Sequence, residues 1–368
     1  MVSAVAPGGG RAEPIHRDAY QLAVDARDPR FDGVFFVGIT TTRVYCRPCC
    51  PSRLAYDRHR RFFDSAAAAE RAGFRPCLRC RPELAPGRTS LAAVSRLAHV
   101  AAQRIAAGAL NGRSVADLAA DLGVSERHLR RALEREVSVS PLELAQTHRL
   151  LLAKRLIVDT DLPMTRVAYS SGFQSLRRFN VVFREQYRMP PSALRRGRRT
   201  PARETASLRL TLSYRAPLDW DALVAGAGRE ATVSIDGHSG RVCVENSPAD
   251  AYLVVEIAES LLPVLMPLIA GLRRVFDVDA EPAVIDAHLA AQGLADLVAR
   301  HPGVRLPGVL ERLEGALPDA FPGSDRRLQR AAGVTGARAL LARAEQWRPW
   351  RAYAAQLLGT LSARPSSP

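Results

Sequence analysis

The sequence lacks a long hydrophobic run. Its most apolar stretch, residues 251–272, carries Glu256, Glu259 and two prolines, which argues against a transmembrane helix. The first 18 residues also lack the apolar core of a secretory signal peptide, so we expect the chain to remain in a reducing cytoplasm. Clustered cysteines are more often metal ligands than disulfides in that compartment. The length of 368 residues allows two or three domains.

Lysine is nearly absent, because Lys154 is the only one among 52 basic residues. A GC-rich genome would favour arginine in this way, and arginine also suits bidentate contacts with phosphate. The positive charge lies in the first 200 residues: the net charge is +5 over residues 15–85 and +11 over residues 88–199, but −1 from residue 200 onward. We therefore expect the first 200 residues, and not the remainder, to bind a polyanion such as DNA.

Five of the six cysteines lie within 35 residues, and four of them have the spacing of a metal site. Cys46, Cys50, Cys77 and Cys80 form a C-x3-C pair, a 26-residue gap and a C-x2-C pair, which is typical of a tetrahedral Zn²⁺ site. Cys49 precedes Cys50, so spacing alone also allows a C-x2-C first pair. Arginines surround these cysteines and predict a metal site that meets phosphate: Arg43, Arg47, Arg53, Arg75, Arg79 and Arg81.

Residues 88–199 have the pattern of an all-helical domain. An apolar-periodic helix ends at Gly123, and Ser125 can cap a second helix with a basic outer face. The same arrangement recurs around Gly172 and Ser175, and a long helix over residues 141–158 joins the two units. A glycine turn between two short helices, the second one basic, indicates a helix-turn-helix unit. The alternative is a helical bundle whose arginines are only solvated.

Residues 31–86, with the strings YCRPCCPSR and FRPCLRCRPE, resemble the zinc-binding N-terminal domain of the Ada methyl-phosphotriester repair proteins. That family has C-R-P-S-C at the first pair, so Cys49 takes the serine position. The resemblance implies that Cys46, Cys50, Cys77 and Cys80 bind Zn²⁺, and that Cys46 accepts a methyl group from DNA. The Pro-Cys-His-Arg motif of the O6-methylguanine acceptor is absent from the chain.

The helical segment resembles the AraC-type DNA-binding domain, including its GF…S…RRF…F…Y…PPS signature over residues 172–192. The resemblance implies two recognition helices in successive major grooves of double-stranded DNA, in an activator that also contacts RNA polymerase. The candidate DNA-binding residues, with two arginines beside the cysteines, are Arg47, Arg79, Arg127, Arg130, Arg131, Gln174, Ser175, Arg177 and Arg178.

The last third reads as short strands over residues 208–223, 232–236, 240–246 and 251–258, followed by a helix over residues 263–278. The strings RAPLDWDAL and GLRRVFDVDAEPAVIDAHLA resemble the N-terminal sheet domain of AlkA-type 3-methyladenine DNA glycosylases. After residues 305–308 the family's intercalating loop, stacking aromatic and helix-hairpin-helix clamp are missing. Asp325 carries over as the family's catalytic aspartate, with a helix N-cap as the competing reading. Gly359 stands where a base-stacking tryptophan is expected.

The predicted fold class is therefore a multidomain α+β chain. We expect a zinc-binding domain over residues 15–86, an all-α double helix-turn-helix domain over 88–197 and a linker over 198–206. An AlkA-like sheet domain over 207–300 and a remnant of the AlkA-like helical domain over 301–368 then form a truncated glycosylase region.

The predicted function is single-turnover methyl transfer from DNA phosphotriesters to Cys46, which converts the protein into a transcriptional activator of an alkylation response in a bacterial cytoplasm, on the nucleoid. The first alternative is a 3-methyladenine DNA glycosylase with regulatory front domains, which needs a base-stacking pocket. The second is a transcription factor with a purely structural zinc, which would tolerate an unreactive Cys46.

Overall fold

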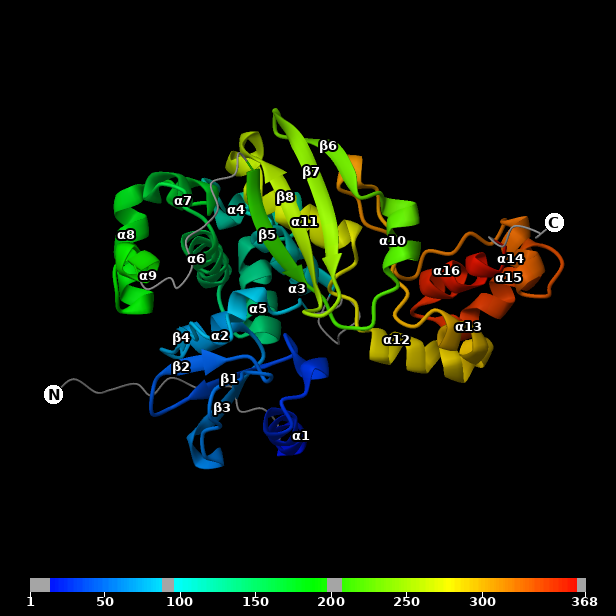
Figure 1. Ribbon diagram of the computed structural model, residues 1–368, viewed down its shortest axis with the longest axis horizontal. Coiled ribbons are helices and arrows are strands. Elements are labelled where there is room, and N and C mark those ends of the chain that lie inside the picture. Colours follow the sequence, from blue (N-terminus) through cyan, green and yellow to red (C-terminus); the bar gives the residue numbers. More distant parts are fainter. Residues whose placement is uncertain (1–13, 88–95, 197–206, 363–368) are drawn as a thin grey trace. The chain divides into compact units, whose positions relative to one another are not determined.

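The computed structural model describes residues 14–87, 96–196 and 207–362 (Figure 1). These residues divide into two compact units, one formed by residues 14–85 and 96–196 and the other by residues 86–87 and 207–362. The predicted linker over residues 198–206 lies outside the described residues. No helix in the described ranges is long and apolar enough to cross a membrane.

The first unit begins with a small α+β domain, here called the N-terminal domain (residues 14–85). Its strands form a sheet in the order β3-β1-β2-β4, in which β2 and β4 are parallel and the other pairs antiparallel. Ser65 caps the short helix α2, because its hydroxyl accepts a hydrogen bond from the Ala68 amide at 3.1 Å. The elements are α1 (Pro14–Asp25), β1 (Phe36–Ile39), β2 (Val44–Cys46), β3 (Arg60–Phe63), α2 (Ala66–Arg71) and β4 (Arg75–Pro76).

The rest of the first unit is the helical domain (residues 96–196). It holds α3 (Arg96–Ala106), α4 (Val115–Asp121), α5 (Glu126–Val137), α6 (Pro141–Asp159), α7 (Met164–Ser170), α8 (Leu176–Tyr187) and α9 (Pro191–Arg196). The turns before α5 and α8 follow the predicted chemistry. Gly123 and Gly172 have φ of +68° and +89°, and Ser125 and Ser175 cap the next helix. The two predicted helix-turn-helix units are therefore α4–α5 and α7–α8, joined by α6.

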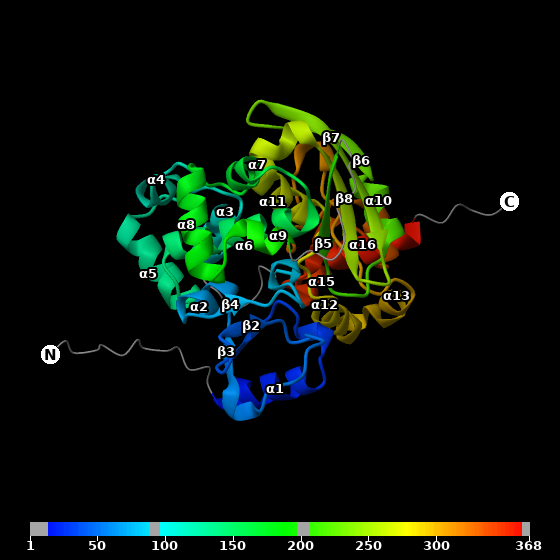
Figure 2. The same ribbon diagram turned by 60° about the vertical axis from the view of Figure 1, so that its left-hand side comes forward.

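The two domains of the first unit share an apolar cluster. Ala67 of α2 packs in one cluster with Ala98 and Ala101 of α3, Leu129 of α5 and Leu144 of α6. In both views α2 and β4 lie beside α6 (Figures 1 and 2). Burial of this common surface stabilises the contact, because apolar area removed from water contributes about 25 cal/mol per Å².

The second unit begins with an antiparallel sheet in the order β5-β8-β7-β6, whose strands are β5 (Ser207–Ser213), β6 (Glu230–Ile235), β7 (His238–Ser247) and β8 (Tyr252–Ala258). The prediction of strand over residues 208–223 is wrong in its second half. Residues Trp220–Ala227 form helix α10, because Asp219 accepts a hydrogen bond from the Ala222 amide at 3.2 Å and caps it. The predicted helix after β8 is α11 (Leu265–Val275), which the six-residue 3-10 segment Glu259–Val264 precedes.

The C-terminal residues form a packed helical cluster: α12 (Pro282–Leu289), α13 (Ala295–Arg300), α14 (Arg326–Ala331), α15 (Ala337–Ala344) and α16 (Arg351–Ser362). Trp347, Leu340 and Leu357 are almost fully buried in it. Asp277, after α11, accepts a hydrogen bond from the Tyr353 hydroxyl of α16 at 2.7 Å, and this contact joins the cluster to the sheet region. The C-terminal residues of the described chain are therefore folded.

Candidate metal centre and nucleic-acid interface

Parallel pairing of β2 with β4 brings the two cysteine pairs together. Val44 is opposite Arg75 and Tyr45 is opposite Pro76, so Cys46 and Cys77 follow at the same edge of the sheet. The Cys77 amide donates to the Tyr45 carbonyl at 2.9 Å and extends this register. A turn after each strand returns the chain, and the sulfur atoms of Cys46, Cys50, Cys77 and Cys80 all lie within 4.8 Å of one another.

Local hydrogen bonds orient these sulfur atoms. The Arg47 amide donates to the Cys80 sulfur and the Arg79 amide donates to the Cys77 sulfur, both at 3.4 Å. The Arg47 guanidinium forms an ion pair with the buried Asp32 and donates to the Cys80 carbonyl at 3.3 Å. Such contacts around a metal site fix the positions of its ligands. Arg47 is therefore held against the cysteine turn, while Arg79 is exposed.

The electrostatics of the four sulfurs favour a cation between them. Contact with Cys50 raises the pKa of the Cys46 thiol, whereas contact with Cys46 lowers the pKa of Cys50 and lowers that of Cys77 to about 6. Each of these four residues is at most 9% exposed. Four thiolates at this spacing repel one another, and a bound divalent metal removes that conflict.

Four sulfur donors in one closed group are the ligand set that Zn²⁺ prefers in structural sites. Cys49 lies outside this group although it is adjacent to Cys50, and burial raises the pKa of its thiol to about 11. The geometry thus groups Cys50, and not Cys49, with the other three cysteines.

The candidate DNA-binding residues of the helical domain lie at the beginnings of α5 and α8. Arg127, Arg131, Gln174, Arg177 and Arg178 are exposed. Arg130 is held by Glu126 one turn earlier, and the Ser175 hydroxyl caps α8. The structure therefore presents most of the predicted set to solvent at the two second helices of the helix-turn-helix units.

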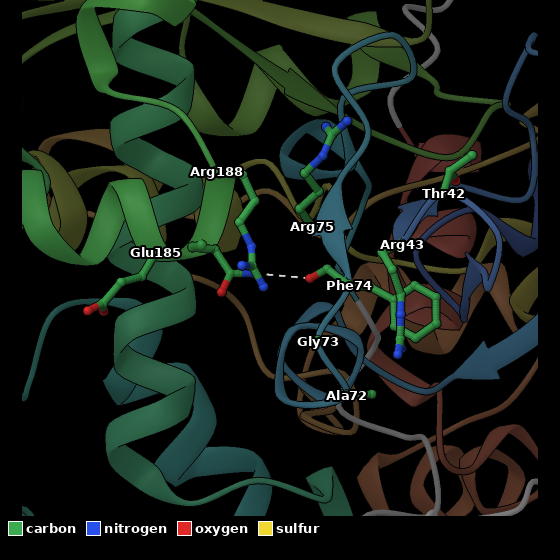
Figure 3. A pocket seen from close by; sticks show the side chains of 9 residues that line it. Thr42, Arg43, Ala72, Gly73, Phe74, Arg75, Glu185 and Arg188 are labelled. Carbon is green, nitrogen blue, oxygen red and sulfur yellow. Dashed lines mark hydrogen bonds between the residues drawn. The ribbon is translucent and has the colours of Figure 1, made fainter.

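A groove of about 440 Å³ lies beside α8 and is lined by residues of both domains (Figure 3). Thr42, Arg43 and Arg75 come from the N-terminal domain, and Arg188 follows α8. The Arg43 guanidinium stacks over Phe74 at 5.4 Å, and the Gln186 side chain donates to the Phe74 carbonyl at 3.0 Å. Three arginines and one carboxylate, that of Glu185, line the groove, so its net positive charge favours an anionic occupant such as phosphate.

Asp325 is the N-cap of α14. Its Oδ1 accepts hydrogen bonds from the Arg327 amide at 2.7 Å and the Leu328 amide at 3.4 Å. These two hydrogen bonds are those of a helix N-cap, so Asp325 has the contacts of the N-cap that the sequence allowed as the alternative. Gly359 lies on α16. A Cβ atom added there would have no neighbouring atom within 4 Å.

Sequence reasoning missed several buried or partly buried polar residues that contact the segments around the metal centre. Glu70 accepts hydrogen bonds from the Tyr45 hydroxyl at 3.0 Å and the Thr147 hydroxyl at 2.7 Å. Glu83 is paired with Lys154, and both side chains are at most 2% exposed. The one signal in the sequence is that Lys154 is the only lysine of the chain.

Three family models match the chain. Residues 19–83 match the metal binding domain of Ada, residues 118–197 match a helix-turn-helix domain, and residues 224–311 match the AlkA N-terminal domain. The predicted resemblances and the predicted fold class are confirmed. The Ada match and the four-cysteine group also confirm Zn²⁺ as the cofactor.

Two curated relatives and one solved structure show the range of similarity. The chain is 36% identical over 317 residues to the probable bifunctional transcriptional activator/DNA repair enzyme AlkA of Mycobacterium tuberculosis (strain CDC 1551 / Oshkosh), covering 80% of this chain and 63% of that protein. It is 43% identical over 75 residues to the bifunctional transcriptional activator/DNA repair enzyme Ada of Escherichia coli (strain K12), covering 20% and 21%.

The refined structure of the DNA methyl phosphotriester repair domain of E. coli Ada is 41% identical. The match covers 20% of this chain and 79% of the E. coli domain, with a TM-score of 0.18. Such a score is too low to establish a shared arrangement of the whole chain.

Proposed function

We propose that this protein removes methyl groups from DNA phosphotriesters by transfer to Cys46 and, once methylated, activates transcription of an alkylation response. The observation that carries the proposal is the group of four sulfurs within 4.8 Å, in the same compact unit as two helix-turn-helix units. The chain spans 63% of the first relative's length, and that relative and E. coli Ada are named as transcriptional activator and DNA repair enzyme at once.

Cys46, Cys50, Cys77 and Cys80 are the proposed ligands of Zn²⁺. The metal, when bound, keeps the Cys46 sulfur in its nucleophilic thiolate form at neutral pH. The amides of Arg47 and Arg79 support the thiolates on Cys80 and Cys77 through the hydrogen bonds described above.

The reaction is an in-line displacement at carbon. The Cys46 sulfur attacks the methyl carbon of the neutral phosphotriester, and a sulfur–carbon bond forms. The carbon–oxygen bond breaks, its electron pair remains on the phosphate oxygen, and the ordinary diester is restored. The thioether is a poor leaving group, so each protein molecule repairs one lesion.

Methylation also changes the charge that faces DNA. Four thiolates and one Zn²⁺ sum to −2, and one methylation leaves −1. At an effective dielectric of ~20, one charge at ~6 Å from one phosphate contributes roughly 3 kcal/mol before ionic screening, and considerably less after it. Loss of that repulsion raises the affinity for operator DNA several-fold.

The methylated protein then binds its operator through the second helices of the helix-turn-helix units. The proposed contacts are Arg127, Arg130, Arg131, Gln174, Ser175, Arg177 and Arg178, with Arg47 and Arg79 beside the metal centre. RNA polymerase is the proposed partner in activation, and the bacterial nucleoid in the cytoplasm is the proposed location.

The test is a label-transfer experiment. Protein is incubated with DNA that carries radiomethylated phosphotriesters, and the labelled residue is located by peptide mapping. We expect stoichiometric label on Cys46, and the variant Cys49→Ser should transfer equally well. Label on Cys77 or Cys80 would disprove the assignment of the acceptor, and an operator affinity unchanged by methylation would disprove the charge switch.

A further inference from the structure

The ammonium group of Lys154 links the two domains of the first unit. It lies on α6 of the helical domain with its side chain 1% exposed. Its Nζ donates to the Cys77 carbonyl at 3.0 Å and pairs with the Glu83 carboxylate, and both acceptors belong to the N-terminal domain. The ammonium group of the helical domain therefore contacts the backbone of a residue in the four-sulfur group.

Two further contacts lie along the same helix. Thr147, two helical turns before Lys154 and so on the same face, donates to the partly buried Glu70 at 2.7 Å. At the end of α6, Asp159 accepts two hydrogen bonds from the Arg81 guanidinium, both at 2.7 Å. Arg81 immediately follows Cys80. Side chains of α6 thus contact the N-terminal domain at two places, at α2 and at the turn that follows Cys77.

The residue type at position 154 agrees with this arrangement. All 51 other basic residues of the chain are arginine. An ammonium is a compact point charge with three rotatable donors, whereas a guanidinium is a planar fork. A compact cation can meet one carbonyl and one carboxylate oxygen in a nearly closed space, and with Arg81, whose Nε donates to the other Glu83 oxygen at 3.0 Å, it compensates the buried Glu83 charge.

We infer that Lys154 and Glu83 connect the metal centre to α6, so that the cysteine turns and the helix-turn-helix units move as one body. Lys154 is a positioning residue that acts through Cys77. This inference rests on the proposed function in one respect: a charge change at Cys46 affects operator affinity only while the sulfur is held at a fixed place over the DNA. A domain on a loose tether would spend most of its time beyond the ~10 Å range of screened electrostatics.

The experiment compares the full-length zinc protein with Lys154→Met and with Lys154→Met/Glu83→Gln. The double variant removes both charges together, so it leaves no lone buried charge if the single variant fails to fold. Arg113→Met is the matched control, because it removes an exposed ion pair with Asp121 elsewhere in the helical domain. Zinc content and label transfer to Cys46 are measured for every protein.

The first readout is hydrogen exchange in peptides covering residues 74–84 and 147–159, before and after removal of zinc by a chelator. In the parent and in Arg113→Met, zinc removal should accelerate exchange at least several-fold in both segments. In the double variant, the acceleration of residues 147–159 should be clearly smaller than in the parent, although the Thr147–Glu70 and Arg81–Asp159 contacts remain. Equal acceleration of residues 147–159 in parent and double variant would overturn the inference.

The second readout is the ratio of operator affinities with and without methylation. We expect the several-fold gain of the parent to fall to less than twofold in the double variant, with zinc content and methyl transfer retained. A full gain in that variant would also overturn the inference. Absence of label on Cys46 in the parent would instead contradict the proposed methyl transfer, and the exchange comparison would still decide whether the link exists.

Discussion

The two compact units of this chain use buried charge in different ways. In the first unit, the buried ion pair of Lys154 with Glu83 joins two domains. In the second unit, the buried Arg305 donates to backbone carbonyls, among them those of Arg215 at 2.6 Å and Gly303 at 2.9 Å. Charge in the first unit therefore lies next to a candidate reaction centre, whereas charge in the second unit satisfies the backbone of its own fold.

A similar contrast applies to two carboxylates, one in each unit. Glu83 follows directly from the Ada-like cysteine string and contacts the ammonium group beside the metal centre. Asp325, the residue that the AlkA resemblance marks as catalytic, has its Oδ1 occupied by two amides of the helix it caps. A family motif retained in sequence thus predicts chemistry only where its surroundings are retained as well.

Loss of the metal should have the largest effect. We expect Cys50→Ser to lose zinc, whereas Cys49→Ser should retain one zinc per chain, because Cys49 lies outside the four-sulfur group. Structural zinc contributes on the order of 10 kcal/mol to the folding of small domains. Metal analysis together with thermal unfolding should show loss of the N-terminal domain's transition in Cys50→Ser alone. Retention of zinc by Cys50→Ser and its loss from Cys49→Ser would mean that the first pair is C-x2-C.

The next largest effect concerns Glu70. Burial raises its pKa to about 7 from an ordinary value of 4.5, despite hydrogen bonds from Thr147 and Tyr45. The folded state therefore binds more protons than the unfolded state between pH 4.5 and 7, and this group's contribution to stability is lost as the pH rises through that window. From the linkage relation the loss is about 3 kcal/mol.

Glu70→Gln removes this titration. Relative to the parent, the variant should gain up to about 3 kcal/mol in free energy of unfolding between pH 4.5 and pH 8. Denaturant unfolding at several pH values measures the difference. The exposed Glu256 of β8 provides the control, because the free energy of unfolding of Glu256→Gln should depend on pH in the same way as that of the parent. A constant difference between Glu70→Gln and the parent across this range would contradict the prediction.

Local chemistry explains which features could be predicted from the sequence. The turns at Gly123 and Gly172, the caps at Ser125 and Ser175, and the cysteine spacing all act over a few residues, so one sequence suffices to predict them. Helix α10 was missed because its apolar residues also suit a strand, and only the Asp219 cap distinguishes the two. The contacts of Lys154 join residues 71 and 77 positions apart, and no local pattern specifies such pairs.

A smaller effect concerns DNA binding, to which we expect only the first unit to contribute. Arg177 is exposed at the start of α8, so Arg177→Ala should weaken operator binding roughly tenfold and, for a phosphate contact, reduce the salt dependence by about one counterion. Arg326→Ala removes an equally exposed arginine from the start of α14 and should leave affinity unchanged. Affinity titrations at several salt concentrations measure both. Equal losses in the two variants would show that the C-terminal unit also contacts DNA.

The smallest expected effect lies at Asp325. A glycosylase must extrude a base, stack it on aromatic side chains and hold the strained backbone, and base stacking contributes ~1–3 kcal/mol per base. The sequence lacks the intercalating loop and hairpin clamp, and Gly359 offers no ring. We therefore expect no release of 3-methyladenine from alkylated duplex DNA by the parent or by Asp325→Asn. Asn caps helices about as well as Asp, so Asp325→Asn should unfold like the parent, whereas Asp325→Ala should lose roughly 1 kcal/mol of stability. Release of free base by the parent that disappears in the folded Asp325→Asn protein would restore the second unit to an enzymatic role and remove the contrast between the two units.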